Sequence, residues 1–287
     1  MQIENMTYED ILCEAVKRLS AAGVSEADTD AWLLFSDSFA LSRSEYFFKK
    51  MEHISPERAQ CLDILFDRLR RREQREPVQY ILGSQEFYGL SFKVTPDVLI
   101  PRLDTEVLVE EILKDGVEGK RVLDLCTGSG CIIETIAHEG RPAFCVGTDL
   151  SEAALMVAKD NAALNGTEVK LMQGDLYEAL DGLEDKTFDI IVSNPPYIAN
   201  RERASLMPEV IDHEPHMALF AKDDGLDFYE RILREAYKYL RPEGTIWFEI
   251  GCEQGEAVTR IARENGYFQV VIIKDLAGLD RVVKIRR

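Results

Sequence analysis

From residue 121 onward, short apolar runs alternate with segments of helical pattern, and this alternation constrains the fold more than any other feature of the chain. The apolar runs predict strands at 121–125, 143–149, 169–173, 188–193 and 245–250. Repeated strand–helix units are typical of an α/β fold with a doubly wound parallel sheet. Such sheets bind their ligands at the carboxyl ends of the strands. The residues that follow each apolar run are therefore the candidates for a functional site.

The first predicted strand is followed by a glycine-rich loop, Cys126–Gly130. Gly128 and Gly130 permit a tight turn and a close approach of the backbone to a ligand. The second strand ends at Asp149, roughly 20 residues beyond the glycines, where a carboxylate would accept hydrogen bonds from ribose hydroxyls. A dinucleotide site would need a small residue where Ile133 stands, and the chain has no G-x-x-x-x-G-K-[ST] phosphate loop. The loop therefore favours a nucleoside ligand without a pyrophosphate.

The third strand is followed by Gly174-Asp175-Leu176. The carboxylate of Asp175 could accept a hydrogen bond from the exocyclic amine of an adenine, with Leu176 as apolar cover. It could also cap the short segment that follows, because aspartate is a common N-cap residue. Its place beside the glycine-rich loop and Asp149 favours the contact with a ligand.

The fourth strand ends in Asn194-Pro195-Pro196-Tyr197. The two prolines make the loop stiff and have no backbone N–H. The amide oxygen of Asn194 and the carbonyl oxygen of Pro195 can both accept hydrogen bonds from one planar NH2 group. Tyr197 offers an aromatic face to the same group. These four residues alone could be a rigid turn, but the glycine-rich loop upstream favours a site that aims an amide or amine nitrogen at an electrophile.

Together these motifs resemble class I S-adenosylmethionine-dependent methyltransferases, and more narrowly the PrmC/HemK family of release factor glutamine methyltransferases. Three further segments extend the resemblance over nearly the whole chain: Glu76–Gly83 resembles E-P-x-x-Y-I-x-G, Val98–Glu106 resembles V-L-I-P-R-P-D-T-E, and Asp275–Val282 resembles D-L-A-G-x-D-R-V. Two positions depart from the family pattern. Leu103 replaces a proline, which is expected to alter only the stiffness of its loop. Cys126 replaces a glycine near the methionine part of the cofactor, which is compatible with binding if its side chain points away.

The resemblance implies a fold, a cofactor and a set of site residues. The fold would be a seven-stranded Rossmann-like class I methyltransferase sheet, closed by an antiparallel pair near 268–274 and 281–286, with a small all-α N-terminal domain joined by a β-hairpin. The cofactor would be S-adenosyl-L-methionine, with S-adenosyl-L-homocysteine as product. The residues expected to bind it are Asp124, Cys126, Thr127, Gly128, Ser129, Gly130, Asp149, Asp175, Leu176 and Asn194. The substrate would contact Asn194, Pro195, Pro196 and Tyr197, of which Asn194, Pro195 and Tyr197 are the candidate catalytic residues.

The implied reaction is methyl transfer to the side-chain amide nitrogen (N5) of the glutamine in the Gly-Gly-Gln motif of class I peptide-chain release factors. Hydrogen bonds from this nitrogen to Asn194 and Pro195 would orient it, and holding it in line with the methyl group would supply much of the rate. The alternative is an adenine-N6 or cytosine-N4 amino-methyltransferase of nucleic acid, because the same loop suits a flipped base. A non-catalytic cofactor-binding protein is disfavoured, because it would not need a clamp that orients an amine.

The formal net charge of −18 at pH 7 bears on the choice between these substrates. A protein that grips the nucleic acid backbone normally carries a basic patch, and this chain is acidic in bulk. We therefore expect release factors as protein partners and no stable binding of nucleic acid. The exception is the arginine cluster Arg68–Arg75 at the end of a predicted helix. It is interpreted as favourable charge at a helix C-terminus, with contact to a partner protein or ribosomal RNA as the alternative.

The cysteines, histidines and apolar runs indicate a cytoplasmic enzyme without a metal. The six cysteines form no C-x-x-C pair, which is typical of reduced thiols. His213-Glu214-Pro215-His216 is more typical of a surface loop than of a metal site, because a proline separates the histidines and no cysteine is near. No apolar stretch reaches the length of a membrane span, and the N-terminus lacks a signal-peptide pattern.

The chain is expected to divide into a helical domain at 1–72, a linker with a hairpin at 73–100 and a methyltransferase domain at 101–287. The resemblance implies that the helical domain helps to recognise the release factor. Its helices are expected to begin at Thr7, at Ser25 and at Ser55, the first with a capping box.

Two groups of residues in this scheme need separate mention. The aromatic residues Tyr46, Phe47 and Phe48 are expected in the core of the helical domain. Arg102, Asp104 and Glu106 could line the substrate path or cap the helix expected from Asp104 to Lys114.

Overall fold

The structure, a computed structural model, describes residues 6–287, which form two compact units. The first unit comprises residues up to Gly83 together with Met207–His213. The second comprises Ser84–Leu206 and Glu214–Arg287. The helical unit therefore extends beyond the predicted boundary at residue 72, and the hairpin belongs to the second unit.

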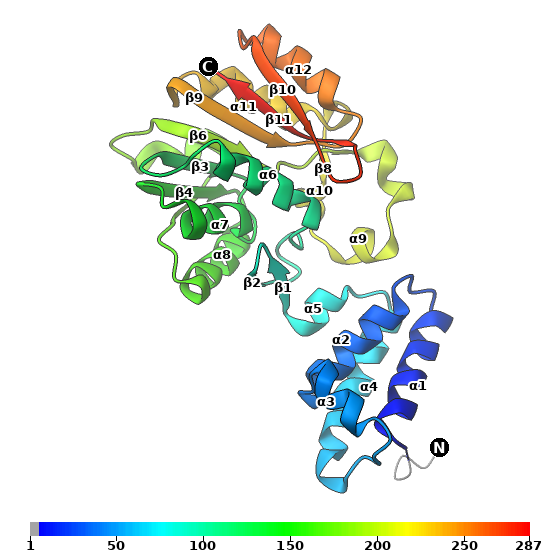
Figure 1. The fold of residues 1–287 in the computed structure, drawn as a ribbon. Helices are drawn as coiled ribbons and strands as arrows, with labels where there is room; N and C mark the ends of the chain where they lie inside the picture. The colour runs from blue at the N-terminus through cyan, green and yellow to red at the C-terminus, as the bar shows by residue number, and fades with distance from the viewer. Residues whose placement is uncertain (1–5) are drawn as a thin grey trace. The chain divides into compact units, whose positions relative to one another are not determined.

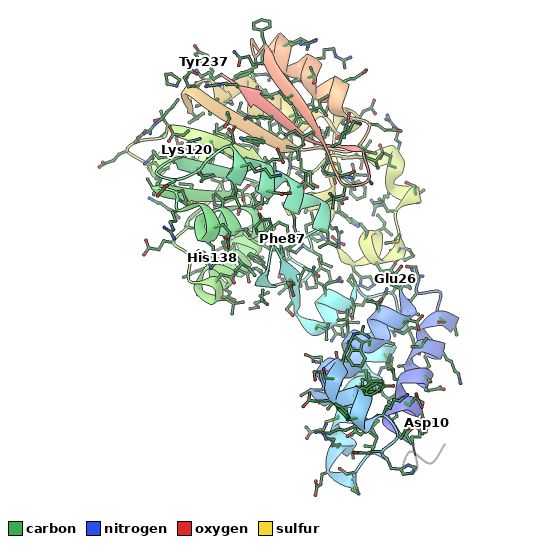
Figure 2. All side chains as sticks on the ribbon, in the orientation of Figure 1. Asp10, Glu26, Phe87, Lys120, His138 and Tyr237 are labelled. Atoms are coloured by element: carbon green, nitrogen blue, oxygen red, sulfur yellow. The ribbon has the colours of Figure 1, made fainter. Side chains whose placement is uncertain are left out.

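The first unit consists of helices that enclose one apolar core. Its elements are α1 (Tyr8–Ala21), α2 (Ala27–Phe39), α3 (Arg43–Lys49), a short 3-10 helix (Pro56–Arg58), α4 (Ala59–Glu73), α5 (Val78–Leu82) and α9 (Pro208–His213). The predicted capping box of α1 is confirmed: the Thr7 hydroxyl accepts from the Asp10 backbone N–H, and Asp10 accepts from the Thr7 backbone N–H at 2.9 Å. Figure 2 shows Asp10 at the start of this helix. Helix α2 begins at Ala27, two residues after the predicted start at Ser25. Its N-cap residue is Glu26, whose side chain makes no cap hydrogen bond.

Of the three aromatic residues of α3 that were expected in the core, only Tyr46 packs against it, and it is partly buried. Tyr46 packs edge-on against Trp32 and Phe35, with ring centroids 5.4 and 5.6 Å apart. Phe47 and Phe48 are 69% and 82% exposed. Consecutive residues of a helix point in different directions, so a short helix that packs through Tyr46 leaves its next two side chains outside the core.

The arginines of the cluster Arg68–Arg75 form ion pairs inside the first unit, in addition to their position at the C-terminus of α4. Arg72 is 5% exposed and contacts Asp30 at 2.7 Å and Glu209 at 2.9 Å. Arg75 holds the other oxygen of Glu209 at 2.7 Å. Burial by itself would raise the pKa of Glu209, but the hydrogen bonds from the two arginines lower this pKa to about 2. This buried network ties α9 to the helical unit.

The second unit contains a seven-stranded sheet in the order β10-β11-β9-β6-β3-β4-β5 (Figure 1). Its strands are β3 (Arg121–Leu125), β4 (Phe144–Asp149), β5 (Lys170–Gln173), β6 (Phe188–Ser193), β9 (Leu240–Glu249), β10 (Gln269–Lys274) and β11 (Asp280–Arg286). Strand β11 pairs antiparallel with both β9 and β10, and the other pairs are parallel. The predicted sheet and its closing antiparallel pair are confirmed. Strand β9 begins at Leu240 rather than at the predicted residue 245. Its first residues were not predicted, because Pro242 and Gly244 are atypical of a strand interior.

Helices cover both faces of this sheet (Figure 1). One face carries α6 (Leu103–Lys114), α7 (Cys131–Gly140) and α8 (Glu152–Asn165), and the other carries α11 (Asp227–Ala236) and α12 (Gly255–Glu264). Side chains of each strand alternate between the two cores, as Val122 and Leu123 show. Two layers of helix around a parallel sheet bury its strands on both sides.

The hairpin of β1 (Ser84–Phe87) and β2 (Leu90–Lys93) packs on the face of α6 and α7. Phe87, which Figure 2 shows at the hairpin, and Phe92 are both 0% exposed. Six short elements complete the unit: 3-10 helices at Leu176–Gly182, Asn200–Ser205 and Asp223–Gly225, strands β7 (Ile198–Ala199) and β8 (Phe220–Ala221), and α10 (His216–Leu219). Among residues 6–287, no helix combines the length and the apolar character that a membrane crossing requires.

Candidate active site

A cavity of about 380 Å³ lies in the second unit, at the carboxyl ends of the parallel strands. The predicted site residues that line it are Cys126, Thr127, Gly128, Ser129, Asp149, Asp175, Leu176, Asn194 and Pro196. The predicted residues that do not line it are Asp124, Gly130, Pro195 and Tyr197. Loops that follow four different strands therefore meet around one space, whose size is in the range of small-molecule sites.

The glycine-rich loop is held by the carboxylate of Asp149. Its Oδ2 accepts from the Gly128 backbone N–H and its Oδ1 from that of Ser151, both at 2.9 Å. Burial raises the pKa of Asp149, and these backbone N–H groups act against the rise. Gly128 has φ +56°, a conformation that glycine adopts without strain. The strand-end carboxylate and the loop are thus one structural unit.

Cys126 adopts φ +61°, which is unfavourable for a residue with a side chain. Glycine adopts this conformation without strain, which explains why the family pattern has a glycine at this position. Burial raises the pKa of its thiol, so the group stays protonated at neutral pH.

Asp124 lies behind the loop rather than in the cavity wall. It is 0% exposed and accepts a hydrogen bond from the Thr127 hydroxyl at 2.6 Å. Burial, with the nearby charge of Asp149, raises its pKa to about 7. Asp124 is therefore absent from the cavity wall and instead holds the hydroxyl of Thr127, which does line the cavity.

Asp175 makes an ion pair instead of a helix cap. Asp175 directly precedes the 3-10 helix Leu176–Gly182, but its side chain makes no cap hydrogen bond. Its Oδ2 lies 2.7 Å from Nη2 of Arg231, a residue of α11 that also lines the cavity. The carboxylate is therefore fixed at the edge of the cavity by a cation.

The Asn194–Tyr197 loop is held from three sides. The Asn194 Nδ2 donates to Oγ1 of Thr105, in the first turn of α6, at 3.4 Å. The Tyr197 hydroxyl donates to Oε1 of Glu249, at the end of β9, at 3.4 Å. The Tyr197 carbonyl accepts from Nε2 of Gln254 at 3.0 Å. Both ends of the loop are thus fixed by side chains from distant parts of the chain.

The motif around Arg102 uses its three charged residues differently. Arg102 lines the cavity and pairs with Glu214 at 2.5 Å. Asp104 pairs with Arg281 at 3.2 Å, and Glu106 accepts from the backbone N–H of Tyr88 at 2.8 Å. The N-cap position of α6 has no side-chain cap hydrogen bond, so the capping interpretation was wrong.

Comparison with known proteins assigns the family. Residues 10–83 match the PrmC N-terminal domain and residues 102–219 match the methyltransferase small domain. A release factor glutamine methyltransferase of Geobacter sulfurreducens is 42% identical over 266 residues, which are 92% of this chain and 91% of the relative. One of Cereibacter sphaeroides is 41% identical over 283 residues, 98% of this chain and 99% of the relative. The chain belongs to the family of release factor glutamine methyltransferases.

A solved methyltransferase from Pyrococcus furiosus matches with a TM-score of 0.55 at 18% identity, over 76% of this chain and 98% of that one. At this identity the match shows the fold alone, and it confirms the predicted α/β methyltransferase class. The PrmC N-terminal model ends at residue 83, where the first of the two segments of the helical unit also ends.

The residues that support the motifs were not predicted from the sequence. Thr105 was part of a recognised segment but had no assigned role. Glu249 is the last residue of an apolar strand and Gln254 follows that strand, neither in a motif, and Arg231 lies on an amphipathic helix. The sequence shows only which helix or strand each of these residues belongs to, and this does not identify the residue that it contacts. Among residues 6–287, no group of three or more His, Cys, Asp or Glu is placed to hold a metal ion.

Proposed function

We propose that the protein transfers a methyl group from S-adenosyl-L-methionine to the side-chain amide nitrogen of the glutamine in the Gly-Gly-Gln motif of class I release factors. The observation that carries the proposal is that Asn194 lines the same cavity as the glycine-rich loop and Asp149. Asn194, one acceptor of the proposed clamp for an NH2 group, thus shares one space with the nucleoside site. Family membership supplies the class of substrate.

The cavity residues fit the cofactor. The carboxylate of Asp149 accepts from the backbone N–H groups of Gly128 and Ser151, and its two oxygens retain lone pairs that ribose hydroxyls can use. Gly128 and Ser129 bring backbone close to the ligand, and Leu176 adds an apolar wall. S-adenosyl-L-methionine supplies an electrophilic methyl group on a sulfonium.

The protein's own part in the reaction is to bind and orient the glutamine amide. An amide nitrogen is a poor nucleophile, because its lone pair is shared with the carbonyl. Asn194 Oδ1 and the Pro195 carbonyl accept hydrogen bonds from the NH2 group and aim its nitrogen. The proximity of the reacting atoms then supplies much of the rate. The nitrogen loses its proton after attack, so no general base is assigned. Tyr197 offers its ring to the planar amide.

We expect the protein to act in the cytoplasm, because the proposed substrates, release factors, act there. The helical unit is the region we expect to take part in recognising the release factor, since its residues match the PrmC N-terminal domain. The alternative of a nucleic acid amino-methyltransferase is disfavoured by the net charge of −18, because phosphate binding depends on cationic side chains.

The test is methyl transfer from labelled S-adenosyl-L-methionine to a purified release factor and to the same factor with its Gly-Gly-Gln glutamine replaced by alanine. Label on the unaltered factor alone supports the proposal. Label on duplex DNA or RNA at low salt, with none on either factor, overturns the substrate assignment.

A further inference from the structure

The cavity adjoins a second hollow of about 260 Å³ on the side of Asp175. The second hollow is lined by residues of the 3-10 helix Leu176–Gly182 and of α11, together with Tyr239. Three residues line both spaces: Asp175, Leu176 and Arg231. These three residues, called the divider below, therefore stand between the cavity and the second hollow.

Contacts in two directions hold Arg231 at the divider. Its Nη2 lies 2.7 Å from Oδ2 of Asp175, so the ion pair joins α11 to the start of the 3-10 helix. Its guanidinium carbon lies 5.5 Å from the ring centroid of Phe228, which also lines the cavity. The face of an aromatic ring attracts a cation. The guanidinium is thus placed by a carboxylate on one side and by a ring on another.

Leu176 has an unfavourable backbone conformation at the divider. Its φ is +52°, in the left-handed region that residues with a side chain rarely adopt. It is 7% exposed and belongs to the core of the second unit. Such a conformation persists only where the surrounding structure fixes the residue. The divider is therefore built into the fold and is not a loose turn.

In the proposed function, the adenine of the cofactor lies beside the divider. Asp149, assigned to the ribose, ends β4, and Asp175 follows β5, the neighbouring strand at the edge of the sheet. A carboxylate accepts several hydrogen bonds, so the pairing with Arg231 leaves Asp175 able to accept from the 6-amino group. A large substituent on this amine would have to displace the Arg231 side chain, because the second hollow lies on the other side of the divider.

We propose that Arg231 is a specificity-determining residue that closes the adenine end of the cavity. Held by Asp175, it lets the site accept an unsubstituted 6-amino group and excludes adenosines with a bulky group on this nitrogen. The inference rests on the proposed function for the place of the adenine, but not for the identity of the methyl acceptor. Protein cavities smaller than the second hollow hold a benzene ring. Removing the Arg231 side chain should therefore open this space to a benzyl group.

The test measures the binding of S-adenosyl-L-homocysteine and of its N6-benzyl derivative by calorimetric titration, without a release factor. The native protein should bind the benzyl derivative about tenfold to a hundredfold more weakly than the parent compound. Arg231→Ala should remove most of this difference, because the benzyl group can then enter the second hollow. Arg234→Ala is the matched control, since Arg234 lines the second hollow but not the cavity, and it should leave the difference unchanged.

Three results would overturn the proposal. The first is equal binding of the two compounds by the native protein. The second is a difference in Arg231→Ala that equals the native one. The third is the same change in Arg234→Ala as in Arg231→Ala, because the second hollow would then be loosened by any truncation. Failure of the proposed function looks different: the native protein would show the size limit and yet leave every release factor unlabelled.

The native protein also offers a test that needs no variant. The side chains of Arg231 and Asp175 are 36% and 39% exposed, and ion pairs at such positions contribute little to stability, so Arg231→Ala should fold. If it does not, the N6-methyl and N6-benzyl derivatives are compared on the native protein. The methyl derivative should bind more tightly, because its substituent is smaller. Equal affinities would contradict a closed end of the cavity.

Discussion

The cavity has two walls that are held in place in different ways. The loop wall, formed by Cys126–Gly130 and Asp149, is fixed by short-range contacts: Thr127 bonds Asp124 three residues away, and Gly128 bonds Asp149 21 residues away. The amide wall, Asn194–Tyr197, is fixed over 89 residues by Thr105 and over 52 residues by Glu249. The first wall is built by a single β-α-β unit, whereas the second depends on the complete sheet.

Each wall is also backed by a buried glutamate, and the two glutamates differ in their surroundings. Glu134, on α7, lies against the loop wall, where a Cβ added at Gly130 would be 2.2 Å from its Oε1. Burial raises the pKa of Glu134 to about 9, and only the side chain of Asn165 acts against the rise. Glu249 has Thr105, Tyr197 and the cation of Arg281 around it. The glutamate behind the loop wall is thus neutral at pH 7, whereas the glutamate behind the amide wall has a cation beside it.

The largest expected effect is that of Asn194→Ala on the amide wall. Removing an oxygen that orients the nucleophile should lower kcat about a hundredfold to a thousandfold. Cofactor affinity should change little, because Asp149 and the glycine-rich loop are untouched. Single-turnover methylation and calorimetric titration of S-adenosyl-L-methionine measure the two quantities. Equal losses in both would mean that the walls do not work separately.

Asp149→Ala should have the opposite pattern, since it removes the anchor of the loop wall and the acceptor for ribose. We expect cofactor affinity to fall about tenfold to a hundredfold, with a smaller change in kcat at saturating cofactor. Asp160→Ala, which removes an exposed partner of Lys93, is the matched control and should leave the affinity unchanged. Unaltered affinity in Asp149→Ala would contradict its assignment to the ribose.

The difference between the walls also explains what the sequence could predict. The strands of the sheet and the meeting of the glycine-rich loop, Asp149 and Asn194 around one cavity agree with the prediction, because each depends on local pattern and on the rule that ligands bind at strand ends. Glu249 and Arg231 were not found, since their partners come from other parts of the chain and only the folded sheet brings them together. Asp124 does not line the cavity, because a strand residue two positions before the loop can face the core instead. Phe47 and Phe48 were misplaced because composition does not tell which face of a short helix is buried.

The neutral glutamate behind the loop wall predicts a pH dependence of stability. The pKa of Glu134 is raised to about 9 in the folded state. Its contribution to the free energy of unfolding is therefore fully present below its ordinary pKa of 4.5. It is lost as the pH rises toward 9, because the unfolded chain ionises and the folded protein does not. Between pH 6 and 7 the native protein should lose up to about 1.4 kcal/mol of unfolding free energy relative to Glu134→Gln. Urea denaturation of both proteins at each pH measures this difference, and parallel pH profiles would show that Glu134 is ionised in the fold.

The smallest expected effect concerns the strained start of the loop wall. Cys126→Gly should relieve a φ of +61°, and it should also increase the freedom of the unfolded chain. The first effect costs the native protein about 1 kcal/mol and the second offsets part of it, so we expect a gain of about 0.5 kcal/mol in unfolding free energy. Cys252→Gly is the matched control: Cys252 is exposed and has no positive φ, and only the entropic loss should remain. If Cys126→Gly destabilises the protein as much as Cys252→Gly does, the side chain of Cys126 makes contacts in the loop wall that outweigh its backbone strain.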